Sequence, residues 1–120
     1  MRENALDPGP LLGTWKNTNP EPRGIAGIEL RQRDGKLTVR VHGAGGADGW
    51  MDWGEAEGDV FAKCASSREA MAFSARYDLG FQIVELQANI KQGVLVVASF
   101  HEIRDGSGRS SYFAREFFFR

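Results

Sequence analysis

Three features of the sequence predict an all-β fold. Short apolar runs recur along the whole chain, regular turn signals separate them, and no window carries a sustained helical stripe. We expect an antiparallel up-and-down meander of about eight to ten strands that closes as a barrel or packs as a sandwich. The 120 residues suit one domain, which we place at residues 11–120 behind a flexible arm, residues 1–10.

Turn signals set the order of the strands. Asp34-Gly35 is the clearest signal, because a type I′ turn needs a positive φ at both central positions. The segment 19–24 is too rich in proline for a β-ladder, and the glycine-rich segment Gly43 to Gly49 is a candidate lid. We predict strands at about residues 11–17, 25–33, 36–42, 50–57, 60–65, 69–77, 81–90, 94–104 and 110–119.

Each turn also predicts which side chains share the inner face, because side chains alternate along a strand. A turn at 91–93 places Phe100 inside, and the next hairpin adds Phe113 and Arg115. A hairpin about Gly58-Asp59 turns Trp53 and both nearby glutamates inward. The polar side chains expected inside are Gln32, Glu55, Glu57, Tyr77, Gln82 and Arg115.

The outer face is expected to carry an apolar patch and both histidines, His42 and His101. Such a patch can mark an interface between subunits. We therefore expect that a homodimer, if one forms, uses this patch. Its members are Ile83, Leu95, Val97 and Ile103.

Composition narrows the class of protein. A net charge of -1 argues against a surface that tracks phosphates, so nucleic acid is not an expected partner. Cys64 is the only cysteine, so no intrachain disulfide can form, and we expect a buried thiol. No Cys/His metal spacing, cofactor motif, apolar signal core or run of ~18 apolar residues occurs, which predicts a cytoplasmic protein without a membrane span.

The inward polar groups have two interpretations. In the first, Arg115 pairs internally with Glu55 or Glu57, or these groups reach solvent at strand ends; in the second, the polar groups fix one end of a ligand in an apolar cavity. Trp50 and Trp53, beside the glycine-rich segment, are candidates for stacking on such a ligand. The expected ligand-binding residues are Trp50, Trp53, Tyr77, Gln82, Phe100, Phe113 and Arg115.

The first predicted strand carries a motif found in one barrel superfamily. Gly13-Thr14-Trp15, with Arg115 or Arg120 near the last strand, resembles the calycins, which include lipocalins, fatty-acid-binding proteins and avidins. The resemblance implies that a basic side chain from the end of the chain packs over the tryptophan and closes the barrel floor. Asp52-Trp53-Gly54 and the segment 105–109 are also similar to small uncharacterised bacterial lipocalin-like proteins.

Three functions are open at this point. The first is binding of a small, largely apolar molecule inside the barrel. The second is a cofactor-free cyclase or isomerase that folds a polyketide-like or terpenoid intermediate, with Glu55, Glu57 or Tyr77 as acid or base. The third is a structural or interaction protein with a filled core.

Overall fold

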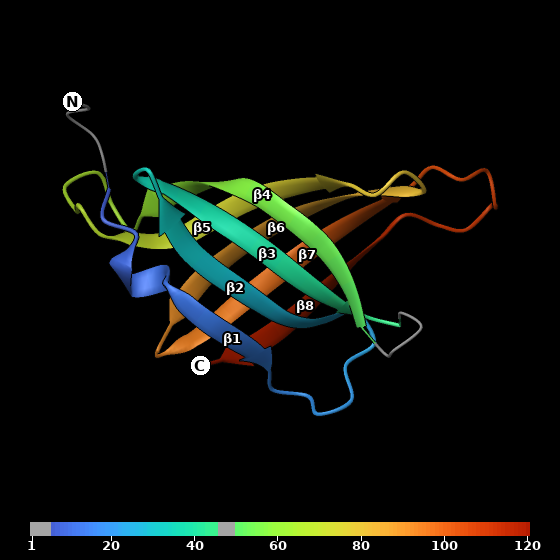
Figure 1. Cartoon of the computed structure of the whole chain (residues 1–120), viewed down its shortest axis with the longest axis horizontal. Helices are drawn as coiled ribbons and strands as arrows, with labels where there is room; N and C mark the ends of the chain where they lie inside the picture. Colours follow the sequence, from blue (N-terminus) through green and yellow to red (C-terminus); the bar gives the residue numbers. More distant parts are fainter. Residues whose placement is uncertain (1–5, 46–49) are drawn as a thin grey trace.

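The computed structural model of the chain describes residues 6–45 and 50–120, and it confirms the antiparallel all-β fold (Figure 1). Eight strands follow one another around a closed barrel, each paired with its neighbours in sequence and the last with the first. A short 3-10 helix, η1 (Gly9–Leu11), precedes them. The strands are β1 (Gly13–Asn17), β2 (Ile25–Arg33), β3 (Lys36–Ala44), β4 (Trp50–Ala62), β5 (Ala70–Asp78), β6 (Gln82–Lys91), β7 (Val94–Ile103) and β8 (Tyr112–Phe119).

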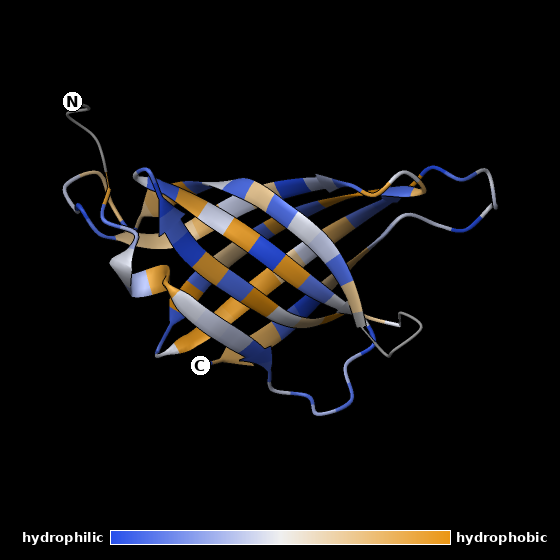
Figure 2. Ribbon diagram, in the orientation of Figure 1, coloured by the Kyte–Doolittle hydropathy of each residue, from blue (hydrophilic) through white to orange (hydrophobic). Residues whose placement is uncertain are grey.

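Apolar side chains fill the middle of the barrel. Apolar and polar residues alternate along the strands, as Figure 2 shows for β2 and β3. Many inward side chains have no water-accessible surface. If a water-sized cavity lay beside them, the atoms lining it would have accessible surface. The interior around these side chains is therefore packed. They include Trp15, Ile28, Val39, Val41, Val84, Leu86, Leu95 and Phe118, each 0% exposed.

The end of the barrel beside η1 is closed around Trp15. The indole Nε1 donates a hydrogen bond to the carbonyl of Leu11 at 2.9 Å. The guanidinium carbon of Arg120 lies 4.3 Å from the centroid of the Trp15 ring. Arg120 therefore takes the position over the tryptophan that the calycin resemblance implies. Gly13, at φ +136°, allows this approach, since a Cβ there would lie 3.2 Å from Arg120 Cδ.

The segment before η1 runs beside β5. The predicted arm begins with residues 1–5, which lie outside the described part of the chain. At Asp7 the backbone is hydrogen-bonded to the barrel. Asp7 N–H donates to Arg68 O, and Ala70 N–H donates to Asp7 O, both at 2.8 Å. Cys64, in the turn between β4 and β5, is exposed, so the expectation of a buried thiol is wrong.

The predicted hairpin about Gly58-Asp59 is wrong, because β4 is one continuous strand through both residues. Gly58 pairs with Leu37 of β3. A Cβ at Gly58 would lie 2.9 Å from Leu37 Cδ2 and 3.0 Å from Val39 Cγ2. The glycine therefore makes room for two core side chains, and it does not form a turn.

Without that hairpin, Glu55 and Glu57 lie on the outer wall, and their predicted inward placement is wrong. Glu55 pairs with Arg33 at 3.3 Å and Glu57 with Lys36 at 3.5 Å. A register shift near Gly54, which has φ +85°, separates these residues from the first part of β4.

The predicted three-residue turn at 91–93 is also wrong. Lys91 pairs with Val94, so the turn contains only Gln92 and Gly93. Both have positive φ, 53° and 79°. A difference of one residue moves every side chain of the following strand to the other face. β7 therefore presents the face opposite to the predicted one, and β8 follows it.

The predicted inward placement of Phe100, Phe113 and Arg115 is wrong for this reason. Phe100 and Phe113 are cross-strand neighbours on the outer wall, 44% and 64% exposed. Their rings stack with centroids 6.2 Å apart. Arg115 is exposed on the same wall.

The predicted outer patch is wrong as well, since Leu95 and Val97 are buried inside the barrel. Ile83 is only 6% exposed, and Ile103 is partly buried. His101, predicted to face outward, is buried, whereas His42 lies on the outer wall beside Glu29.

Candidate functional site at the open end of the barrel

The end opposite Trp15 carries the candidate site. Antiparallel order brings the connections 18–24, 79–81 and 104–111 to this end, as Figure 1 shows. Strand pairing aligns one inner row across β5 to β8. The row consists of Tyr77, Val84, His101 and Tyr112. We define the open-end site as Trp53, Tyr77, Gln82, Ser99, His101 and Tyr112.

His101 is held on both ring nitrogens. Nδ1 lies 3.0 Å from Gln82 Oε1, and Nε2 lies 3.0 Å from Ser99 Oγ. With Gln82 Oε1 as acceptor, Nδ1 carries the hydrogen and Nε2 accepts the hydrogen of the Ser99 hydroxyl. Burial lowers the pKa of the His101 imidazole. The ring is therefore a neutral, fixed, flat surface.

Tyr112 covers one face of that imidazole. The two rings stack with centroids 4.4 Å apart and planes 5° apart. His101 is 6% exposed, but Tyr112 is 53% exposed. A solvent-exposed ring thus lies on a buried one at the barrel mouth.

The Gln82 side chain offers further hydrogen-bond donors. Its oxygen is used by His101, and its NH₂ group has no partner among the described residues. No fully buried polar side-chain atom of the described chain lacks a partner, so this nitrogen retains accessible surface. Two N–H donors are therefore free beside His101.

Trp53 and Tyr77 lie where the barrel wall opens. The pairing of β4 with β5 extends from Asp59 and Ser74 to Ala62 and Ala70, and the strands diverge toward the open end (Figure 1). The Trp53 and Tyr77 rings meet edge to face, with centroids 5.6 Å apart. The two rings therefore occupy the opening between β4 and β5.

The Tyr77 hydroxyl forms hydrogen bonds across this opening. It donates toward two backbone carbonyls, Val39 O at 2.8 Å and Gly54 O at 3.1 Å. Burial raises the pKa of the phenol. The hydroxyl is therefore a protonated donor that ties β5 to β3 and β4.

The structure brings three of the predicted ligand-binding residues, Trp53, Tyr77 and Gln82, to the inside of the barrel. Phe100, Phe113 and Arg115 lie outside. Trp50 begins β4 opposite Ala44. The predicted lid, Gly43 to Gly49, begins inside β3, and its residues 46–49 lie outside the described residues.

Sequence reasoning missed Ser99, His101 and Tyr112. The signal that could have revealed them is the length of the Gln92-Gly93 turn. A two-residue type I′ turn with glycine in its second position is common between strands. That register turns Ser99 and His101 inward together.

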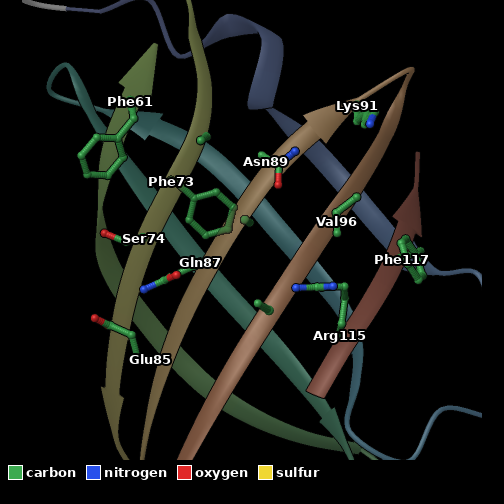
Figure 3. A pocket seen from close by; sticks show the side chains of 13 residues that line it. Phe61, Phe73, Ser74, Glu85, Gln87, Asn89, Lys91, Val96, Arg115 and Phe117 are labelled. Atoms are coloured by element: carbon green, nitrogen blue, oxygen red, sulfur yellow. The ribbon is translucent and has the colours of Figure 1, made fainter. Parts of the chain in front are cut away.

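The outer wall carries a groove of about 790 Å³ across β4 to β8. Figure 3 shows Phe61 and Phe117 on its two sides, with Gln87 and Asn89 between them. The groove is hollow because small outward residues, Ala72, Ser74 and Ala98, lie among larger neighbours. It is separate from the open-end site.

Within residues 6–45 and 50–120, no cluster of three or more His, Cys, Asp or Glu side chains has the geometry of a metal site. None of the described helices is long and apolar enough to cross a membrane.

The fold defines the class of this protein as a closed, eight-stranded, antiparallel up-and-down barrel. No protein-family model, curated protein or solved structure matches the chain.

Proposed function

We propose that the protein is a calycin-like barrel that binds a small, largely apolar, planar molecule at its open end. The observation that supports this function is the stack of half-exposed Tyr112 on buried His101. A flat ligand can take the place of the Tyr112 ring, because that ring stacks on His101 and is itself 53% exposed. The ligand would then stack on an imidazole that Gln82 and Ser99 already fix in position.

The polar part of the ligand follows from Gln82. Its free NH₂ group recognises a hydrogen-bond acceptor, such as a carbonyl oxygen, a carboxylate or a ring nitrogen. Trp53 and Tyr77, in the opening between β4 and β5, supply further apolar contact at the mouth. The proposed ligand is therefore a planar molecule with an acceptor at one edge.

The packed interior limits how deep the ligand can reach. Val84, in the inner row that contains His101, has no accessible surface, and neither do Val41 and Leu86 in the barrel interior. Opening a cavity among them would separate well-packed apolar groups, which costs about 1 kcal/mol for each methyl-sized void. We therefore place the ligand at the mouth.

A thermal-shift screen of planar heteroaromatic carbonyl compounds tests this proposal. Compounds that bind the folded protein raise its Tm. We expect a larger rise in Tyr112→Ala, which vacates the slot, and none in His101→Leu, which removes the flat surface. His42→Leu, a matched change on the outer wall, should behave like the unchanged protein. Equal shifts in all four proteins, or no shift with any compound, would contradict the proposal.

The geometry offers less to the enzymatic alternative. Glu55 and Glu57 lie in ion pairs on the outer wall, and the Tyr77 hydroxyl is committed to two carbonyls. The three candidate catalytic groups therefore do not face a common reacting position.

The packed interior favours the other alternative, an interaction protein. The exposed rings of Phe100 and Phe113 on the outer wall offer a surface for such an interaction, which does not depend on a ligand at the open end. A cytoplasmic location remains the expectation from the sequence.

A further inference from the structure

The two sides of the barrel wall differ in the chemistry of their outward residues. The wall formed by β2 to β4 carries four ion pairs, Arg31–Glu29, Arg33–Glu55, Lys36–Glu57 and Arg40–Asp52, and a hydrogen bond between His42 and Glu29. On β7 and β8, the outward residues form no ion pair with another described residue. We call this second surface the aromatic wall. It consists of Val94, Val96, Ala98, Phe100, Phe113, Arg115, Phe117 and Phe119, and Glu102 is the one acidic outward residue of β7, at its edge beside Phe100.

Four phenylalanines dominate the aromatic wall. Phe100, Phe113, Phe117 and Phe119 are 44%, 64%, 46% and 49% exposed. Rings of this size, each about half exposed, present on the order of 400 Å² of aromatic surface. The largest apolar patch on a typical monomer is about 300–600 Å², and one partner in a standard interface buries about 800 Å². The rings alone supply about half of such a face, and Val94, Val96 and Arg115 extend it.

We propose that the aromatic wall is the interface of a homodimer. Its composition is that of an interface centre, where aromatic residues and arginine are enriched and lysine and acidic residues are depleted. Arg115 lies between Phe113 and Phe117 on β8. Its guanidinium can stay charged while it stacks on a ring of the partner.

A second copy of this chain fits because the shape of the wall is self-complementary. Ala98 and Arg115 form one cross-strand row, and Phe100 and Phe113 form the next. A two-fold axis that runs in the plane of the interface, parallel to these rows and midway between them, places Phe100 over the partner's Ala98. The small side chain of Ala98 leaves room there. The same operation places Arg115 over the partner's Phe113. Each contact occurs twice, as an isologous interface requires.

Sedimentation velocity over a range of micromolar concentrations tests the homodimer. We expect the mass of two chains for the unchanged protein and a dissociation constant more than about tenfold higher for Phe113→Glu. Ala98→Lys, which fills the proposed space on β7 with a charge, should act in the same direction. Met51→Glu is the matched control, since Met51 is 40% exposed but pairs with Gly43 on the β3–β4 side of the barrel and does not line the groove beside the wall.

Circular dichroism on each variant separates lost association from lost folding. A monomer at every concentration would overturn the proposal and leave the wall to a different partner. A dimer that persists in folded Phe113→Glu and Ala98→Lys, or that is lost only in Met51→Glu, would overturn it equally. None of these outcomes depends on whether a ligand binds at the open end.

Discussion

Arg120 lies over the indole of Trp15 and joins the two strands that close the barrel. Its guanidinium carbon is 4.3 Å from the ring centroid, and its Nη1 donates to Leu12 O at 2.6 Å. This contact matters because β1 and β8 pair at two positions, Lys16 with Phe119 and Asn17 with Phe118, and one further backbone hydrogen bond, from Thr18 N to Phe117 O, joins the segments beside them. Side chains must therefore supply much of the attachment between these strands.

Replacing Arg120 should weaken this closure. Arg120→Ala removes a cation–π contact and a hydrogen bond, so we expect the free energy of unfolding to fall by about 1–2 kcal/mol. Urea denaturation measures the change. Arg31→Ala is the control, because Arg31 forms an exposed ion pair with Glu29 and its loss should cost less than about 1 kcal/mol. Equal losses in the two variants would contradict the role of Arg120.

Glu116 should stabilise the same junction at the last residue of β1, Asn17. Its carboxylate accepts hydrogen bonds from Asn17 Nδ2 at 2.7 Å and from Ile25 N at 3.3 Å. Glu116→Leu leaves both donors without this acceptor, and we expect a loss of about 1–3 kcal/mol. Hydrogen exchange should accelerate first at Ile25. Unchanged exchange there would show that the carboxylate does not hold β2 in place.

The turn after β6 should accept a stabilising change. Gln92 has φ 53°, a region that asparagine tolerates better than glutamine. We expect Gln92→Asn to raise the free energy of unfolding by about 0.5–1 kcal/mol. Gly93→Ala should lower it by about 1 kcal/mol, because Gly93 has φ 79° although a Cβ there meets no atom within 4 Å. A stabilising Gly93→Ala would contradict the two-residue turn.

Stability should fall in mildly acidic solution because of His101. Burial lowers the pKa of His101 in the folded protein, whereas the unfolded chain has a value near 6.5. Protons therefore bind the unfolded chain preferentially. The stabilising contribution is complete above pH 6.5 and is lost as the pH falls through the lower, folded pKa. Urea denaturation between neutral and mildly acidic pH should show this slope, and His101→Leu should reduce it. An identical slope in the variant would be evidence against a depressed pKa.

Local turn chemistry predicted part of the fold correctly. Asp34-Gly35 identified its hairpin, and both residues have the positive φ that a type I′ turn requires. Gln92-Gly93 has the same backbone conformation, but glutamine is a weak signal for it. The sequence therefore predicts a three-residue turn that includes Lys91. This prediction exchanges the inward and outward side chains of the two following strands.

Gly58 shows a different limit of sequence reasoning. A glycine followed by an acidic residue is a good turn signal in isolation. Here the glycine is needed because the side chains of Leu37 and Val39 approach β4 closely. Contacts between residues distant in sequence decide this position, and a single sequence does not contain them.

Part of the candidate site was predicted where the strand register was right, whereas Trp53 faces inward although the hairpin from which its placement was argued is wrong. Tyr77 and Gln82 precede the misplaced turn, so their inward placement was predicted correctly. Ser99, His101 and Tyr112 follow it, so the hydrogen-bonded imidazole and its covering ring were missed. Prediction of the site from the sequence therefore depends on the length of one turn, Gln92-Gly93, more than on any motif.

Native mass spectrometry on the protein purified from its own organism tests the central claim most directly. We predict an extra mass of small-molecule size on the unchanged protein, a larger bound fraction in Tyr112→Ala and none in His101→Leu. Bare protein in every case, or the same bound mass in His101→Leu, would contradict binding at the open end.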